Sequence, residues 1–112
     1  MEVTKTNITG VFVIEPKIFK DQRGYFFESY NKLVLQNFGI TYTFVQDNQS
    51  KSTYGVIRGL HFQNPPYTQT KLVRVLAGKI IDVAVDVRKN SPTYGQHVSV
   101  ELSDDNCKQL LI

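Results

Sequence analysis

The segment Lys79–Arg88 shows the clearest alternation of apolar and polar residues in this chain. One set of alternate positions holds Ile81, Val83, Val85 and Val87, and the other holds Asp82, Ala84, Asp86 and Arg88. Successive side chains of a strand point to opposite faces, so this pattern predicts a β-strand with one apolar face. We expect the apolar set to lie in the core. The set with the acids faces either solvent or a polar cavity, and the alternation alone leaves both possibilities open.

The rest of the chain is also mostly β in character, with short runs of β-branched and aromatic residues between turn residues. The other expected strands are Val11–Ile14, Tyr25–Tyr30, Thr41–Gln46, Val56–Phe62, Lys71–Leu76 and Val98–Leu102. A single helix is expected at Asn31–Phe38, where Asn31 can cap the start and Gly39 can end it. Many short strands at close spacing predict an all-β sandwich or barrel.

Composition limits the class of protein. A length of 112 residues predicts one domain. The net charge of +3 comes from dispersed residues, which argues against nucleic-acid binding. Cys107 is the one cysteine, so no internal disulfide can form and a reducing compartment is favoured. Without an apolar run of membrane-spanning length or a signal-peptide pattern, we expect a cytoplasmic protein with no membrane partner.

Groups suited to proton transfer and anion binding are concentrated between residues 46 and 71. The imidazole of His61 is a base near neutral pH and can remove a proton from a carbon beside a carbonyl. A lone histidine is more often a packed strand residue or a metal ligand. Because Phe62 and Gln63 follow it and no second histidine is near, we expect no metal site.

Arg58 and Lys71 are the candidate cationic groups. The guanidinium of Arg58 matches the oxygens of a phosphate, and the ammonium of Lys71 could stabilise an enolate. Either residue could instead be an ordinary surface cation. Arg58 precedes His61 by three positions, which puts the two on opposite faces of a regular strand. If both enter one pocket, Gly59 should mark a bulge or bend.

Weaker candidates lie further towards the N-terminus. Gln46 and Asn48 share strand parity on either side of Asp47, and their amides can both donate and accept hydrogen bonds. The alternative is the start of a polar turn. Arg23 and Glu28 flank an aromatic run, which by itself indicates only a turn followed by core residues.

Several motifs in fixed order cover essentially the whole chain. They are Gly10–Pro16, Asp21–Glu28, Phe44–Asn48, Gly55–His61, Lys71–Val75, Asp82–Arg88 and Ser91–Gly95. In this order they resemble the dTDP-4-dehydrorhamnose 3,5-epimerase family. The resemblance implies a cupin-like double-stranded β-helix, or jelly-roll, with one short helix. It also implies that residues 1–112 form a single cupin-like domain that is the N-terminal part of a longer family domain, incomplete at its C-terminal end.

The resemblance further implies a cofactor-free epimerisation at C3 and C5 of dTDP-4-dehydro-6-deoxy-D-glucose, which gives dTDP-4-dehydro-L-rhamnose for dTDP-L-rhamnose biosynthesis. His61 corresponds to the general base and Lys71 to the group that stabilises the enolate. The implied substrate contacts are Arg23, Phe26, Glu28, Gln46, Asp47, Asn48, Arg58, Lys71 and Asp82. Those of Arg23, Phe26 and Glu28 come partly from the neighbouring subunit of a homodimer.

Family members continue well beyond the position of Ile112, and their second half supplies a tyrosine proton donor, an acid that orients the base and further strands. We therefore expect that residues 1–112 alone do not epimerise both centres, and that open sheet edges favour association. Three alternatives stay open. They are a non-catalytic dTDP-sugar-binding cupin, a 3-epimerase or 5-epimerase acting on a related dTDP-keto sugar, and a structural all-β domain.

Overall fold

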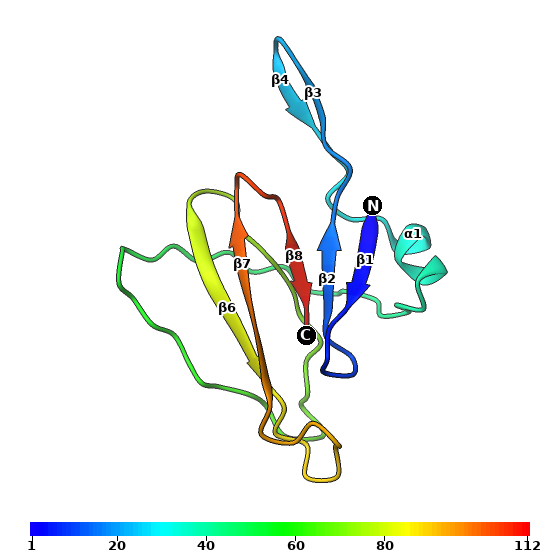
Figure 1. Cartoon of the computed structure of the whole chain (residues 1–112), viewed down its shortest axis with the longest axis vertical. Coiled ribbons are helices and arrows are strands. Elements are labelled where there is room, and N and C mark those ends of the chain that lie inside the picture. Colours follow the sequence, from blue (N-terminus) through cyan, green and yellow to red (C-terminus); the bar gives the residue numbers. More distant parts are fainter.

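A computed structural model describes all residues 1–112. It contains eight strands and one short helix (Figure 1). In chain order these are β1 (Glu2–Lys5), β2 (Phe12–Glu15), β3 (Phe19–Asp21), β4 (Gly24–Phe26), α1 (Lys32–Asn37), β5 (Leu72–Arg74), β6 (Lys79–Val85), β7 (His97–Ser103) and β8 (Gln109–Leu111). The all-β class and the single helix expected from the sequence are confirmed.

The central sheet has four strands in the order β1-β2-β8-β5, and all of its pairings are antiparallel. Strand β8 lies inside this sheet, where Leu111 pairs with both Phe12 of β2 and Leu72 of β5. The ladder continues one residue further, because Lys71 and Ile112 exchange two backbone hydrogen bonds of 2.8 and 2.9 Å. The last residues of the chain therefore hold the N-terminal hairpin and the segment after Lys71 together.

Alternate side chains of β8 supply the two cores on the two faces of this sheet. Leu110 packs with Ile8, Val11, Ala84 and Leu102, on the side of the β6–β7 hairpin. Leu111 packs with Ile14, Leu35 and Ile40, on the side of α1. The sheet is therefore a middle layer between a β-hairpin and a short helix, as Figure 1 shows.

The burial of β6 contradicts the predicted direction of its faces. Ile81 is 60% exposed and Val83 is 41% exposed, whereas Ala84 and Asp86 are buried. The partner strand explains this result, because Asp82 pairs with Val100 and Ala84 with Val98, and these β7 valines pack against the core. The sequence of β6 alone indicates an apolar face, but β7 determines which face meets the sheet.

The single helix forms almost where it was predicted. The Oδ1 atom of Asn31 accepts hydrogen bonds from the backbone N–H groups of Leu33 (3.0 Å) and Val34 (3.2 Å), which are otherwise unpaired in the first turn. Gly39, with φ of +80°, follows the helix end at a backbone conformation that favours glycine. The buried Leu35 attaches the helix to the sheet.

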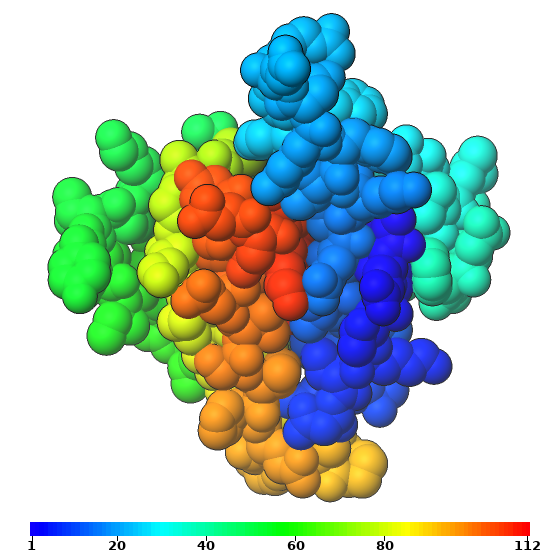
Figure 2. Space-filling model, turned by 45° about the horizontal axis from the view of Figure 1, so that its top comes forward, coloured from blue at the N-terminus to red at the C-terminus, as the bar shows by residue number.

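Several strand predictions are wrong. Thr41–Gln46 and Val56–Phe62 contain no strand, and only Tyr25 and Phe26 of the expected Tyr25–Tyr30 strand lie in β4. Residues 45–70 are exposed throughout and lie outside the sheet, as the green segment in Figures 1 and 2 shows. An extended segment becomes a strand only when a neighbouring strand completes its hydrogen bonds, and none pairs with these residues.

Three observed strands, β1, β3 and β8, are not among the strands listed from the sequence. Strand β3 pairs with β4 in a two-stranded hairpin that stands out from the body of the molecule (Figures 1 and 2). Its side chains are exposed, including those of Phe19, Tyr25 and Phe26. The helix α1 does not have the length and apolar character needed to cross a membrane.

Candidate functional site

Asp82 lies within electrostatic reach of two predicted site residues, His61 and Lys71, which come from other segments of the chain. His61 lies in the exposed irregular segment, Lys71 immediately precedes β5, and Asp82 is half-buried on the inner face of β6. The charges of Lys71 and His61 both lower the pKa of the Asp82 carboxyl, so the three side chains share one electrostatic environment. The structure thus brings together three of the predicted site residues.

Burial is the largest influence on Asp82. It raises the pKa of this carboxyl above the ordinary value of 3.8, because a less hydrated site disfavours the charged form. A hydrogen bond from the Val83 backbone and the nearby charges of Lys71 and His61 oppose this rise without cancelling it. Of the two surroundings that the sequence left open for this residue, a fully solvated sheet face does not fit, and a polar site near Lys71 and His61 does.

Gly59 turns the chain between Arg58 and His61. Its φ of +133° is one that L side chains rarely adopt, and a Cβ at this position would lie 3.7 Å from Nδ1 of His61. The change of direction expected at this glycine is therefore present, although the segment is not a strand. Arg58 donates from Nε to Oγ of Ser52 (3.0 Å) and from Nη2 to the Lys51 carbonyl (3.4 Å), which ties its guanidinium to the preceding loop.

The two amides predicted to point the same way do so. Nε2 of Gln46 donates to Oδ1 of Asn48 at 3.1 Å, and both side chains are exposed. Asp47 lies between them and is also exposed. The three residues form an open polar surface in a segment without regular secondary structure. Their proposed role in substrate binding stays a prediction.

The β3–β4 hairpin carries the remaining candidates. Arg23, at the hairpin turn, donates from Nη2 to Oδ2 of Asp21 at 2.7 Å, and this hydrogen bond lowers the pKa of the Asp21 carboxyl. Phe26 is exposed at the end of β4, and Glu28 follows it with its carboxylate accepting a 3.1 Å hydrogen bond from Asn31. Because the hairpin stands away from the body (Figure 1), a single chain does not gather these residues around His61.

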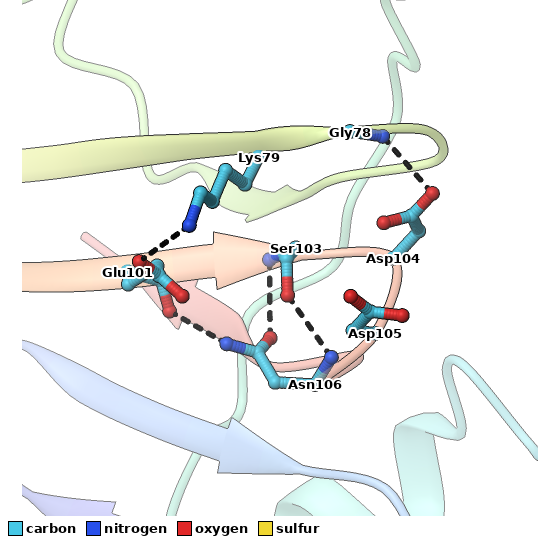
Figure 3. Close-up of a pocket in the computed structure, with 7 residues that line it drawn as sticks. All are labelled: Gly78, Lys79, Glu101, Ser103, Asp104, Asp105 and Asn106. Atoms are coloured by element: carbon cyan, nitrogen blue, oxygen red, sulfur yellow. Dashed lines mark hydrogen bonds and ion pairs between the residues drawn. The ribbon is translucent and has the colours of Figure 1, made fainter.

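Two shallow hollows of the surface lie elsewhere. One is formed by the turns that precede β6 and follow β7, and it is lined only by glycine and polar or charged residues (Figure 3). The other surrounds Asp21, Gln22 and Arg23 at the hairpin turn. Neither includes His61, Lys71 or Asp82; His61 and Lys71 are exposed, and Asp82 is half-buried. The chain also contains no group of three or more His, Cys, Asp and Glu side chains arranged to hold a metal ion.

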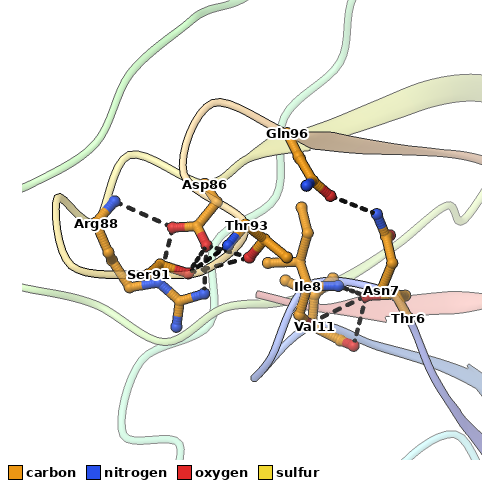
Figure 4. Close-up of polar contacts among 9 residues, drawn as sticks. All are labelled: Thr6, Asn7, Ile8, Val11, Asp86, Arg88, Ser91, Thr93 and Gln96. Carbon is orange, nitrogen blue, oxygen red and sulfur yellow. Dashed lines mark hydrogen bonds and ion pairs between the residues drawn. The ribbon is translucent and has the colours of Figure 1, made fainter.

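The most extensive polar network centres on Asp86, which the sequence analysis placed on the polar face of a strand without assigning it a role. Its buried carboxylate accepts hydrogen bonds from Arg88, Ser91 and Thr93 (Figure 4). The Arg88 guanidinium is the largest of the influences that lower the pKa of Asp86. The spacing Asp-x-Arg-x-x-Ser-x-Thr was visible in the sequence, and the network closes the connection between β6 and β7.

Sequence and structure comparisons connect this architecture with known proteins. The sequence profile of the dTDP-4-dehydrorhamnose 3,5-epimerase family matches residues 5–112. A dTDP-4-dehydrorhamnose 3,5-epimerase from Shigella flexneri is 55% identical over 113 aligned residues, which include all of this chain and 62% of the relative. The chain therefore spans about three fifths of the length of this curated relative.

Two solved structures are similar over 99% of the chain. A Bacillus anthracis dTDP-4-dehydrorhamnose 3,5-epimerase with TDP and PPi bound is 53% identical, with a TM-score of 0.95, and 64% of it is covered. A Legionella pneumophila dTDP-6-deoxy-D-glucose-3,5-epimerase in complex with dTDP-4-keto-L-rhamnose is 51% identical, with a TM-score of 0.92, and 59% of it is covered. These matches confirm the family resemblance and the cupin jelly-roll fold.

Proposed function

The chain belongs to the dTDP-4-dehydrorhamnose 3,5-epimerase family, and from this membership we propose that residues 1–112 are the N-terminal, base-bearing part of such an epimerase. The proposed reaction inverts C3 and C5 of dTDP-4-dehydro-6-deoxy-D-glucose and gives dTDP-4-dehydro-L-rhamnose. Residues 1–112 are one portion of the longer cupin-like domain of the family. A cytoplasmic location fits the single cysteine, which is buried and unpaired.

The observation that carries the proposal is the shared location of His61, Lys71 and Asp82, within a chain that matches the family from residue 5 to its last residue. An imidazole base and an ammonium group are the two groups needed to remove a proton beside a ketone. The family resemblance predicts their proximity, and the influence of both groups on the Asp82 carboxyl supports it.

The proposed chemistry begins at a carbon beside the C4 ketone of the sugar. His61 removes the proton, the C–H electrons form a carbon–carbon double bond, and the carbonyl electrons move onto the oxygen to give an enolate. The ammonium of Lys71 stabilises the negative charge on that oxygen. Epimerisation is complete when an acid returns a proton to the opposite face of the same carbon. The family resemblance assigns that acid to a tyrosine beyond the part represented by residues 1–112.

Binding of the nucleotide is assigned to the arginines and amides. Arg58 would leave its contacts with Ser52 and the Lys51 carbonyl to bind the diphosphate, since its fork of donors suits paired oxygens. We place Arg23, Phe26 and Glu28 at the site of a second copy in a homodimer. The protruding hairpin supports this arrangement, because it carries these residues away from its own chain.

The decisive test measures binding and proton exchange separately. Calorimetry measures the affinity for dTDP, and NMR follows the incorporation of solvent deuterium at C3 and C5 of the dTDP-keto sugar. Arg58→Ala should weaken dTDP binding by about tenfold or more, while Arg74→Ala, which removes an exposed arginine from β5, should leave the affinity within about twofold.

His61→Asn should retain dTDP binding and abolish any deuterium incorporation, by roughly 100-fold or more. The matched control is His97→Asn, at the exposed start of β7. Equal exchange in the two histidine variants would reject His61 as the base.

The main alternative is a dTDP-sugar-binding cupin without turnover. It is favoured by the exposure of His61, which lies in a segment without regular secondary structure. Water-exposed groups stabilise an enolate poorly compared with groups in an enclosed site. Tight dTDP binding with no deuterium incorporation at either carbon would select this alternative, and incorporation at one carbon would select an epimerase for a single centre.

A further inference from the structure

We propose that Gln109 is a positioning residue that fixes Glu28 for contact with the nucleotide. Gln109 lies in β8 within the central sheet and is 1% exposed. Its side-chain Nε2 donates a 2.7 Å hydrogen bond to the backbone carbonyl of Ser29, which is 80 residues away in the sequence. This bond connects the rigid sheet directly to the segment between the β3–β4 hairpin and α1. The nucleotide as the ligand of Glu28 rests on the proposed function.

Two hydrogen bonds restrain Glu28, one at the neighbouring residue and one at its own side chain. Its neighbour Ser29 is tied to the sheet, and its carboxylate accepts a 3.1 Å hydrogen bond from Nδ2 of Asn31. Oδ1 of Asn31 in turn caps α1 through the N–H groups of Leu33 and Val34. The Glu28 side chain itself stays exposed, so it is oriented without being buried.

The oxygen of the Gln109 side-chain amide indicates that this residue does more than fill space in the core. Its Oε1 is buried and has no hydrogen-bond partner. A buried acceptor without a donor lowers stability, and an apolar side chain of similar size would avoid that cost. The contribution that an amide makes here is therefore its bond to Ser29. Gln109 shares a face of β8 with Leu111, which packs against Leu35 of α1, so this face is the one that supports the Ser29–Asn31 segment.

The experiment compares Gln109→Met with Leu111→Met in the full 112-residue chain. Both substitutions put methionine on the same face of β8, but only the first removes a hydrogen bond. Backbone amide hydrogen exchange is read by NMR along the chain, and dTDP affinity is read by calorimetry. Gln109→Met should increase exchange at residues 33–35, whose N–H groups bond to Asn31, by tenfold or more relative to β1 and β2, and should weaken dTDP binding severalfold. Leu111→Met should produce neither effect.

The side-chain NH2 signals of Gln109 provide a second test in the unaltered protein. They should exchange at least tenfold more slowly than those of Gln36, which is exposed on α1. Equal exchange of the two amides, unchanged protection of residues 33–35 in Gln109→Met, or a uniform loss of protection over the whole chain would each overturn the positioning role. If the unaltered chain does not bind dTDP, the proposed function fails, whereas the exchange measurements still decide whether Gln109 fixes this segment.

Discussion

Asp86 shows how a single charged residue can be accommodated in a small core. Five hydrogen bonds converge on its two carboxylate oxygens, from the backbone and guanidinium of Arg88 and the hydroxyls of Ser91 and Thr93. All of these partners lie within seven residues of Asp86 in the sequence. Because its donors are local, the carboxylate can be buried without unpaired charge, and it fixes the loop that joins β6 to β7.

This arrangement predicts a defined loss of stability in acid. The native contacts hold the pKa of Asp86 below the ordinary value of 3.8, so its stabilising effect is fully present above that pH. As the pH falls below about 4, the unfolded chain takes up the proton first, and this part of the free energy of unfolding is progressively lost. Thermal unfolding followed by circular dichroism between pH 2.5 and pH 7 measures the effect.

Asp86→Asn should lower the midpoint of thermal unfolding at pH 7 by roughly 5 °C or more and reduce its dependence on pH below 4. Asp105→Asn is the control, since that residue is exposed and no hydrogen bond to its carboxylate is present. An identical acid dependence in Asp86→Asn and the unaltered chain would contradict the account.

At the level of the residue, side chains with functional groups were easier to predict from the sequence than the contacts that they make in the fold. The residue types and motif order indicated His61, Lys71 and Asp82, and the structure brings these three together. The bond from Gln109 to Ser29 joins positions 80 residues apart, and neither residue belongs to a local pattern that indicates the contact. Long-range contacts of this kind depend on the pairing of β8, which no short motif specifies.

At the level of the element, the β6–β7 hairpin shows what alternation can and cannot predict. The period of two correctly separated the side chains of β6 into two sets, but the core lies on the side of Ala84. In an antiparallel pair, directly opposite residues share a face, so the valines of β7 select the buried side of β6. The two-residue period of a strand follows from local sequence, whereas the direction of its faces depends on its pairing with a neighbour.

The corrected assignment of faces predicts two very different mutational effects. Leu102 on β7 is fully buried opposite Ile80, so Leu102→Ala should lower the free energy of unfolding by about 2–5 kcal/mol. Ile81→Ala, on the outer face of β6, should change it by less than about 1 kcal/mol. Urea unfolding followed by far-ultraviolet circular dichroism measures both. A larger loss for Ile81→Ala than for Leu102→Ala would restore the original assignment of the core face.

The segments that were predicted as strands but form none show that a strand depends on a neighbouring strand. Val56–Phe62 has the composition of a strand, but within residues 1–112 no strand lies beside it. Gly59 also breaks the regular alternation, with a φ outside the extended region. Composition therefore predicts a tendency towards an extended backbone, but these residues form no hydrogen bonds with a neighbouring strand. The missed β1 is the converse case, since Glu2–Lys5 has a mixed composition and pairs fully with β2.

At the level of the whole molecule, the fold leaves both strand edges and apolar side chains uncovered. The central sheet ends at β1 and β5, and the two hairpins β3–β4 and β6–β7 form separate two-stranded sheets. Ile57 and Val45 are each 92% exposed, and Ile81 and Val83 lie on an outer sheet face. Uncovered edges and apolar surfaces of this kind favour association with another chain.

We therefore expect the isolated chain to associate in solution. Sedimentation at protein concentrations of roughly 1–100 µM should show species larger than the monomer, increasing with concentration, because apolar burial and edge pairing are both gained on contact. Ile81→Lys should weaken the association by about tenfold or more, since an ammonium on the outer face of β6 must be desolvated in any contact there. Thr9→Lys adds the same charge on an exposed residue between β1 and β2, and should leave association within about twofold. A monomer at every concentration would show that these surfaces are not used, and equal association of the two lysine variants would place the contact away from β6.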